Sequence, residues 1–216
     1  MVTRYGYDVV VKTAFLTVLA SLAVWFLVES RDLRFSLLCA LLLGLIFIIR
    51  FFRDPDRRTP VGPGLVISPA DGRVVLVEKV DELEYLKSRG VQISIFMSPL
   101  NVHVNRFPVT GMVSYVRHFP GEFLVAFDHK SSARNERNSI GIENGVGRVL
   151  TKQIAGFVAR RIVAPVKPGD AAVAGERFGM IRFGSRVDVV VPESSQVQVK
   201  VGDRAVAGET VLAVLT

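Results

Sequence analysis

The chain has 216 residues, which is enough for one domain, or two small ones, with a buried core. Half of the residues are hydrophobic and 22% are charged, a balance that excludes both a disordered tail and a polytopic transporter. A net charge of +7 is compatible with nucleic acid or with anionic lipid. Because no basic run with interleaved aromatics and no zinc-finger spacing occurs, no nucleic-acid partner is expected.

Two apolar runs near the N-terminus hold most of the hydrophobic excess. Residues 13–28 and 35–49 contain no charge, and a charged turn separates them. At ~1.5 Å per residue each run gives about 24 Å of helix, short of the ~30 Å hydrocarbon core. The pattern predicts a membrane-associated helical hairpin within residues 1–53, and both a spanning and a re-entrant hairpin remain open. A cleavable signal peptide is the competing interpretation, but the charged turn is a poor cleavage site.

Basic residues flank this hairpin on both sides. Arg4 and Lys12 precede it, and four arginines follow it between residues 50 and 58. The positive-inside rule therefore predicts a cell-membrane protein whose termini and second domain are cytoplasmic. The single cysteine, Cys39, lies in the second apolar run, so no intrachain disulfide is possible.

Residues 54–216 are predicted to form a second, β-rich domain behind a proline-punctuated linker. Short β-rich runs separated by turn signals favour a mainly β fold, an antiparallel barrel or sandwich. The expected strands are 65–67, 72–80, 92–96, 111–116, 140–144, 146–151, 187–191, 196–201 and 211–215. Residues 153–161 are predicted to form a short helix, and residues 81–89 a weaker second one.

An internal repeat supports a β architecture. Residues 169–176 (GDAAVAGE) recur 33 positions later as residues 202–209 (GDRAVAGE), each after a Val-Lys pair. The spacing resembles the hairpins of biotinyl and lipoyl carrier domains, which present a lysine at a hairpin tip. Between the two copies no lysine occurs before Lys200, so the repeat predicts a scaffold with structural glycines.

Three histidines are the first candidates for chemistry. His103, His118 and His129 include no pair at a metal-ligand spacing, so no metal site is expected. His118 and His129 are expected to be solvated loop residues. His103 shares a short polar segment with two asparagines and Arg106, and its spacing leaves a structural and a functional role equally open.

Five short motifs occur in the chain in the same order as in a known family. They are FFRDPDR (51–57), SPADG (68–72), VHVNR (102–106), ARNERN (133–138) and FGSR (183–186). Together they resemble the phosphatidylserine decarboxylase proenzymes of the short bacterial and archaeal type, and the resemblance covers essentially the whole chain. Each motif alone is weak, and it is their common register that carries the resemblance.

The resemblance implies that the chain cuts itself between Gly184 and Ser185, and that Ser185 becomes an N-terminal pyruvoyl group. The products would be a β chain of residues 1–184 and an α chain of residues 185–216, which stay together as a heterodimer and could form a higher oligomer. This covalent pyruvoyl group would be the cofactor, with no pyridoxal phosphate and no metal. An isolated Gly-Ser pair would be an ordinary turn, and its register with the other motifs favours the cleavage site.

The resemblance also implies roles for individual residues. His103 would act as the base that activates Ser185, oriented by Asp71, and would later protonate the decarboxylated product. Longer relatives carry a second histidine in this loop, where this chain has Arg106. The lipid phosphodiester would be bound by a cationic and amide set, with ion pairing to Glu136 left open as a structural alternative. That set is Arg106, Arg134, Asn135 and Arg137.

The predicted function is therefore a carboxy-lyase that converts phosphatidylserine to phosphatidylethanolamine and carbon dioxide. The hairpin would hold the β domain at the headgroup plane, because a diacyl lipid leaves the bilayer reluctantly. The alternative is a membrane-anchored adaptor or carrier module with biotinyl-like hairpins and no catalysis. That alternative predicts an intact chain.

Overall fold

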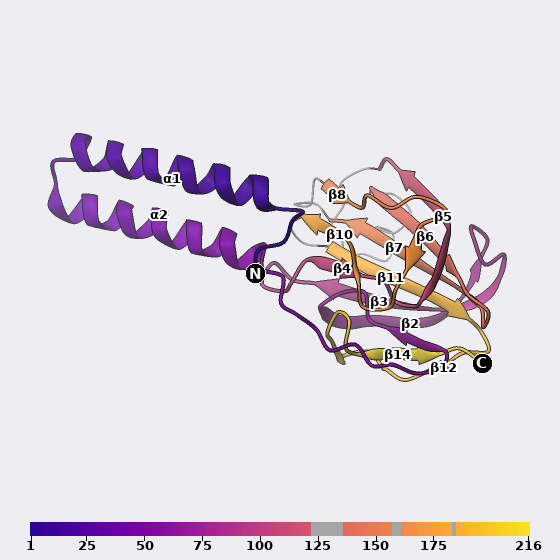
Figure 1. Cartoon of the computed structure of the whole chain (residues 1–216). Coiled ribbons are helices and arrows are strands. Elements are labelled where there is room, and N and C mark those ends of the chain that lie inside the picture. The colour runs from indigo at the N-terminus through magenta and orange to yellow at the C-terminus, as the bar shows by residue number, and fades with distance from the viewer. Residues whose placement is uncertain (122–135, 157–160, 183–184) are drawn as a thin grey trace. The chain divides into compact units, whose positions relative to one another are not determined.

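The computed structural model divides the chain into two units, Met1–Pro55 and Asp56–Thr216. It describes residues 1–121, 136–156, 161–182 and 185–216. The N-terminal unit is helical and the second unit is built from strands (Figure 1).

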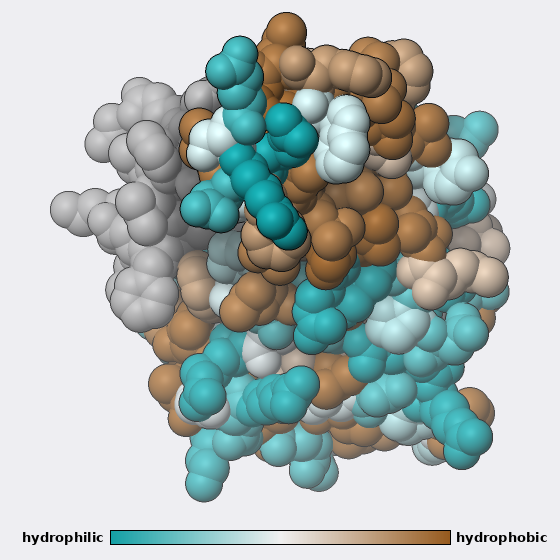
Figure 2. All heavy atoms as spheres, turned by 90° about the vertical axis from the view of Figure 1, so that its left-hand side faces the viewer, coloured by the Kyte–Doolittle hydropathy of each residue, from teal (hydrophilic) through white to brown (hydrophobic). Residues whose placement is uncertain are grey.

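The N-terminal unit is a hairpin of two helices, α1 (Tyr7–Leu27) and α2 (Arg31–Phe51). Each helix has 21 residues and so extends over about 32 Å. The helices are longer than the uncharged runs because they include charged residues at their ends. Both helices are long and apolar enough to cross a membrane. Figure 2 faces the hairpin end and shows apolar side chains on the outer surface around a polar tip. The predicted helical hairpin is confirmed.

The turn and the base of the hairpin are fixed by polar and aromatic contacts. Ser30 caps α2 by accepting a hydrogen bond from the Leu33 N–H (3.5 Å), and Arg34 donates to the Val28 carbonyl (2.6 Å). At the base, Phe52 is fully buried, and a Cβ at Gly6 would overlap its ring. The residues that follow α2 therefore close the hairpin against the N-terminus.

The second unit contains one large sheet and two small ones (Figure 1). The large sheet has the order β13-β2-β3-β11-β7-β6-β5-β9, with bounds Arg204–Ala205, Gly72–Glu82, Ser88–Met97, Ser185–Pro192, Arg148–Ala155, Arg137–Glu143, Gly111–Phe119 and Ala171–Ala172. One small sheet has the order β1-β14-β12, with bounds Leu65–Ile67, Val211–Val214 and Gln196–Val197. The other has the order β4-β10-β8, with bounds Val104–Arg106, Arg177–Arg182 and Arg161–Val163. All strand pairs in the described ranges are antiparallel, which confirms the predicted fold class.

The main core lies against one face of the large sheet. Alternate residues of β11, such as Val187 and Val189, are fully buried in it, as are Ile93 and Ile95 of β3. The small sheets contribute Val66, Leu212 and Phe178 to the same cluster. Strand β11 pairs with β3 on one side and β7 on the other, so it is buried on both edges. The N-terminal residue of this strand is Ser185.

The two copies of the sequence repeat dock in the same way on two parts of the large sheet. In the first copy the Gly169 N–H donates to Val113 O, and in the second the Gly202 N–H donates to Val74 O, both at 2.8 Å. The glycines at 169, 175, 202 and 208 have φ between 77° and 99°, a region that glycine adopts without strain. The docking partners, residues 107–113 (FPVTGMV) and 68–74 (SPADGRV), share Pro, Gly and Val at matching positions.

The two predicted short helices of this unit are wrong. Residues 81–82 and 88–89 lie in β2 and β3, and residues 83–87 form the turn between them. The buried Glu82 carboxylate fixes this turn by accepting hydrogen bonds from the N–H groups of Tyr85 (2.7 Å) and Leu86 (2.8 Å). Gln153 lies in β7 and Arg161 begins β8, with residues 157–160 outside the described ranges. Pairing with β6 and β11 overrides the helix propensity of this segment.

Candidate active site

Ser185 lies at the beginning of β11, between Met97 of β3 and Ala155 of β7. Its side chain is fully buried, and its hydroxyl lies 3.3 Å from the Met97 thioether sulfur. Sulfur in a thioether is only a weak hydrogen-bond acceptor. Gly184, the other half of the predicted cleavage site, lies outside the described residues.

A tight loop after β3 positions His103. The Asn101 side-chain carbonyl accepts hydrogen bonds from the N–H (2.9 Å) and the hydroxyl (2.8 Å) of Ser98. The Asn101 backbone carbonyl lies 3.0 Å from Nδ1 of His103, whose side chain is fully buried. Because a carbonyl oxygen can only accept, Nδ1 carries the hydrogen, and in the neutral ring Nε2 is the basic nitrogen.

His103 lies close in the fold to the chain that leads to Ser185. Its backbone carbonyl accepts a hydrogen bond from the N–H of Ile181 (3.3 Å), near the end of β10, four positions before Ser185. Ser185 pairs with Met97, the last residue of β3, and His103 lies in the loop that follows β3. The predicted base and the predicted nucleophile therefore lie at the same end of β3.

Asp71 is held by contacts of its own. Both of its carboxylate oxygens accept hydrogen bonds from one guanidinium nitrogen, Nη2 of Arg57 (2.9 and 3.0 Å), and Oδ1 also accepts from the Ala207 N–H (2.8 Å). In the other half of the repeat Thr110 occupies the equivalent position and accepts from the Ala174 N–H (3.1 Å). A side-chain acceptor at this position therefore belongs to the scaffold, whereas the negative charge and its arginine partner are particular to Asp71.

The SPADG and VHVNR motifs are in direct contact. The Pro69 carbonyl accepts hydrogen bonds from the Arg106 N–H (3.0 Å) and from the Asn105 side chain (3.4 Å). The guanidinium of Arg106 is buried and donates to the Gly175 carbonyl (2.8 Å). These contacts fix Asp71 and His103 relative to each other through adjacent backbone.

Of the other predicted substrate residues, Arg134 and Asn135 lie outside the described residues, as does His129. Arg137 begins β6, where its guanidinium is 3.4 Å from the Glu84 carboxylate and lies over the Phe119 ring at 4.1 Å. Glu136, the partner considered from the sequence, has its carboxylate 3.7 Å from Nε2 of the exposed His118.

Sequence reasoning assigned no role to four buried residues that form a chain leading away from Ser185. They are Met97, Asn105, Asn138 and Gln153, whose side chains are connected by hydrogen bonds. A signal was present in β7, where Gln153 follows Val149 and Thr151 at alternating, inward-facing positions. An amide in such a row requires polar partners inside the domain.

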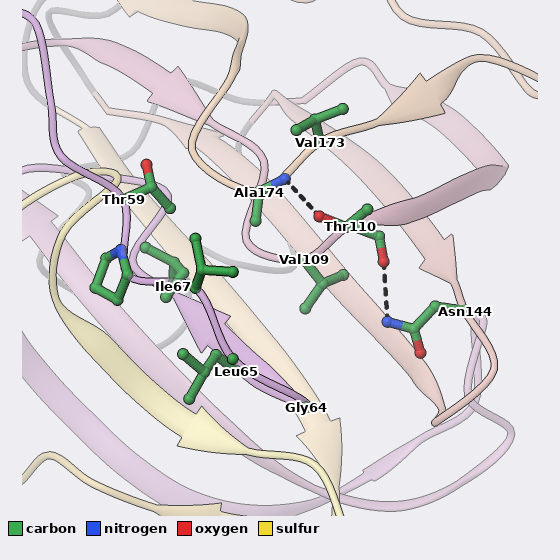
Figure 3. Close-up of a pocket in the computed structure, with 12 residues that line it drawn as sticks. Thr59, Gly64, Leu65, Ile67, Val109, Thr110, Asn144, Val173 and Ala174 are labelled. Carbon is green, nitrogen blue, oxygen red and sulfur yellow. Dashed lines mark hydrogen bonds between the residues drawn. The ribbon is translucent and has the colours of Figure 1, made fainter.

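A cavity of about 390 Å³ lies elsewhere in the domain, between the linker, β1 and the first repeat copy (Figure 3). Leu65, Ile67, Val109 and Val173 give it apolar walls, and Thr110 is hydrogen-bonded to Ala174 and Asn144. Its described lining contains no charged side chain, and none of the predicted catalytic residues borders it. The cavity therefore offers no group for acid–base chemistry.

The chain combines a helical hairpin long and apolar enough to cross a membrane with a mainly antiparallel β domain that buries a serine and a histidine. Comparison with known proteins gives the family. Residues 45–213 match the family model described as phosphatidylserine decarboxylase. The chain belongs to the phosphatidylserine decarboxylase family.

Full-length relatives support the same assignment. The chain is 48% identical over 215 residues to the phosphatidylserine decarboxylase proenzyme of Chlorobium luteolum, covering 99% of each chain. It is 43% identical to the proenzyme of that name from Chlorobium phaeobacteroides strain DSM 266, covering 98% of this chain and 99% of the relative. Identity to the Chlorobaculum tepidum proenzyme is 45%, over 98% of this chain and 96% of the relative.

Proposed function

We propose that this chain is a proenzyme that cleaves itself between Gly184 and Ser185 and then converts phosphatidylserine to phosphatidylethanolamine and carbon dioxide. The observation that carries the proposal is the setting of Ser185. It is a fully buried hydroxyl at a strand start, held by a weak acceptor and close in the fold to a buried histidine with a fixed basic nitrogen. The relatives named as proenzymes give independent support.

Self-cleavage requires a base and a nucleophile in water-poor surroundings. Ser185 Oγ attacks the carbonyl carbon of Gly184 while His103 takes the hydroxyl proton and returns it to the leaving amide nitrogen, so that an ester replaces the peptide bond. Loss of the Cα proton of Ser185 then expels the Gly184 carboxylate and leaves a dehydroalanine. Water converts this to a ketone with release of ammonia.

Asp71 would support the charged form of His103 during this transfer. An aspartate that orients a histidine and stabilises its imidazolium is the recurring third member of such sets. In the structure the Asp71 carboxylate is bound by Arg57. For this role its negative charge would stabilise the His103 imidazolium electrostatically, across the place where the two motifs meet at the Arg106 N–H···O=C Pro69 hydrogen bond.

The residues present fit a pyruvoyl group, since its precursor Ser185 is already buried at the place where the group would be needed. A pyruvoyl ketone supplies the electron sink for decarboxylation. His103 would deliver a proton to the product carbon from Nε2. Arg106, Arg134, Asn135 and Arg137 would bind the phosphodiester. Of the two that the structure describes, Arg106 is buried and Arg137 is partly exposed.

The sheet explains how two chains would remain together after cleavage. The α chain, residues 185–216, begins with β11, which pairs with β3 over eight positions and with β7 over six. The same segment supplies β14, which pairs with β1. A cut before Ser185 would therefore leave a heterodimer with a shared core. The helical hairpin would keep this domain at the lipid headgroups on the cytoplasmic side, where phosphatidylserine is reached without extraction.

The proposal is tested by intact-mass measurement of the full chain and of Ser185→Ala, with decarboxylation of phosphatidylserine in vesicles measured on both. We expect two chains and activity from the wild type, and one chain without activity from Ser185→Ala. A single uncut and inactive wild-type chain would remove the proposal and favour the adaptor or carrier alternative.

A further inference from the structure

A chain of buried amides leads from β6 to the SPADG motif. Asn138 donates to the Gln153 side-chain carbonyl (3.1 Å), and Gln153 donates to the Asn105 side-chain carbonyl (2.8 Å). The Asn105 amide nitrogen in turn faces the Pro69 carbonyl (3.4 Å) and the Met97 sulfur (3.9 Å). Asn105 and Gln153 are fully buried, and Asn138 is 5% exposed.

The direction of this chain is fixed by its last acceptor. The Pro69 backbone carbonyl can only accept a hydrogen bond, so the Asn105 end that faces it must be the NH₂ group. The Asn105 carbonyl then points to Gln153, which must donate, and the Gln153 carbonyl points to Asn138. Each amide is thereby oriented by the next, and an NH₂ group is directed at the Met97 sulfur.

Met97 links this chain to Ser185. A methionine side chain has three rotatable bonds and adapts to its surroundings, so it does not fix a neighbour by itself. Here its sulfur receives both the Ser185 hydroxyl (3.3 Å) and the Asn105 amide. Because a thioether accepts weakly, it directs the hydroxyl without binding the proton firmly, and the proton remains available to a base.

We propose that Met97, held in place by the Asn105–Gln153–Asn138 chain, is the positioning residue for the Ser185 hydroxyl in self-cleavage. This inference rests on the proposed function, and it names residues that would position the nucleophile for the self-cleavage step. Misplacing a nucleophile by about 1 Å can cost 10²-fold in rate, so a side chain that only sets the hydroxyl's direction has a measurable effect.

The first variant is Met97→Leu, a swap of similar volume that cores tolerate well. The full-length proenzyme is made by cell-free synthesis with lipid vesicles, and the appearance of the α chain is followed on a denaturing gel. We expect cleavage to slow by about 10- to 100-fold while the thermal unfolding midpoint stays within a few degrees of the wild type. Cleavage at the wild-type rate would overturn the proposal.

The second variant is Gln153→Met, which breaks the amide chain, with Thr151→Val as its matched control. Thr151 lies on the same strand and face, is fully buried, and its hydroxyl has no hydrogen-bond partner among the described residues. We expect Gln153→Met to slow cleavage and Thr151→Val to leave its rate unchanged. Equal rates for these two variants would contradict the role of the amide chain.

The double variant separates positioning from general damage to the fold. If the amide chain acts through the Met97 sulfur, Gln153→Met should slow Met97→Leu no further, whereas independent structural defects would multiply. Multiplied effects would overturn the proposal. Failure of the proposed function looks different, because then the wild-type chain itself would remain uncut.

Discussion

The negative charge of Asp71 can be removed while the side chain keeps its structural hydrogen bond to the backbone. Asp71→Asn keeps a side-chain oxygen for the Ala207 N–H, which the native carboxylate accepts at 2.8 Å. The other half of the repeat uses neutral Thr110 for the same kind of bond to Ala174. The fold therefore tolerates a neutral acceptor here, and the change addresses the charge alone.

The contacts of Asp71 set the expected magnitudes. Nη2 of Arg57 donates to both Asp71 oxygens, at 2.9 and 3.0 Å, and both side chains are 13% exposed. Arg57 keeps a second carboxylate, Glu209, at 3.9 Å. Loss of charge-assisted hydrogen bonds of this kind costs about 1.5–3 kcal/mol, against a domain stability of about 5–15 kcal/mol. The variant should fold. Because an amide does not stabilise an imidazolium, self-cleavage should fall by about 10²- to 10⁴-fold.

The assay is a time course of α-chain release from the full-length proenzyme, with the unfolding midpoint measured in parallel. Thr110→Val is the matched control, since it removes the equivalent bond to Ala174 and should cost about 1 kcal/mol without changing the cleavage rate. Wild-type cleavage by Asp71→Asn, or equal slowing by Thr110→Val, would refute a catalytic role for the Asp71 charge.

Two further predictions concern stability and the lipid headgroup. Burial by itself raises the pKa of Glu82, but the N–H groups of Tyr85 and Leu86 and the charge of Lys152 lower it by more, so the folded pKa lies below the ordinary 4.5. The stabilisation that the ionised Glu82 carboxylate provides is then complete above about pH 4.5, and it is lost as the pH falls through the folded pKa. Glu82→Gln should cost about 1.5–3 kcal/mol in denaturant unfolding at pH 7 and weaken this acid-dependent loss, and an unchanged acid profile would contradict the assignment. Arg137→Ala should raise KM for phosphatidylserine. Glu84→Gln is its control, because it removes the charge of the carboxylate that contacts Arg137 and keeps the arginine. Unchanged affinity of Arg137→Ala for a phosphoserine headgroup would count against a binding role.

Much of the fold could be predicted from local sequence patterns. Strands β2, β3 and β11 follow segments rich in β-branched residues, and the hairpin follows its uncharged runs. Strands of two or three residues, such as β4 and β9, carry no periodic signal and are fixed by their pairing partners. Residues 81–89 contain helix-forming side chains, yet their ends pair as β2 and β3, and one buried carboxylate, Glu82, fixes residues 83–87 as the hairpin loop between them.

The candidate site could be predicted only where single residues stand in sequence motifs. Ser185 and His103 stand in recognisable motifs, whereas the partners that hold them are distant in sequence. Arg57 reaches Asp71 across 14 positions, and Gln153 reaches Asn105 across 48. Such pairs depend on how β4, β7 and the linker come together, and no spacing within the sequence encodes them.

The central claim, that Ser185 becomes a ketone, is tested most directly on the small chain itself. The purified protein is treated with hydroxylamine under denaturing conditions and its chains are measured by intact mass. The account predicts a fragment of residues 185–216 that lacks a free amino terminus and gains the mass of one oxime. An uncut chain, or a fragment that begins with an ordinary serine and does not react, would contradict it.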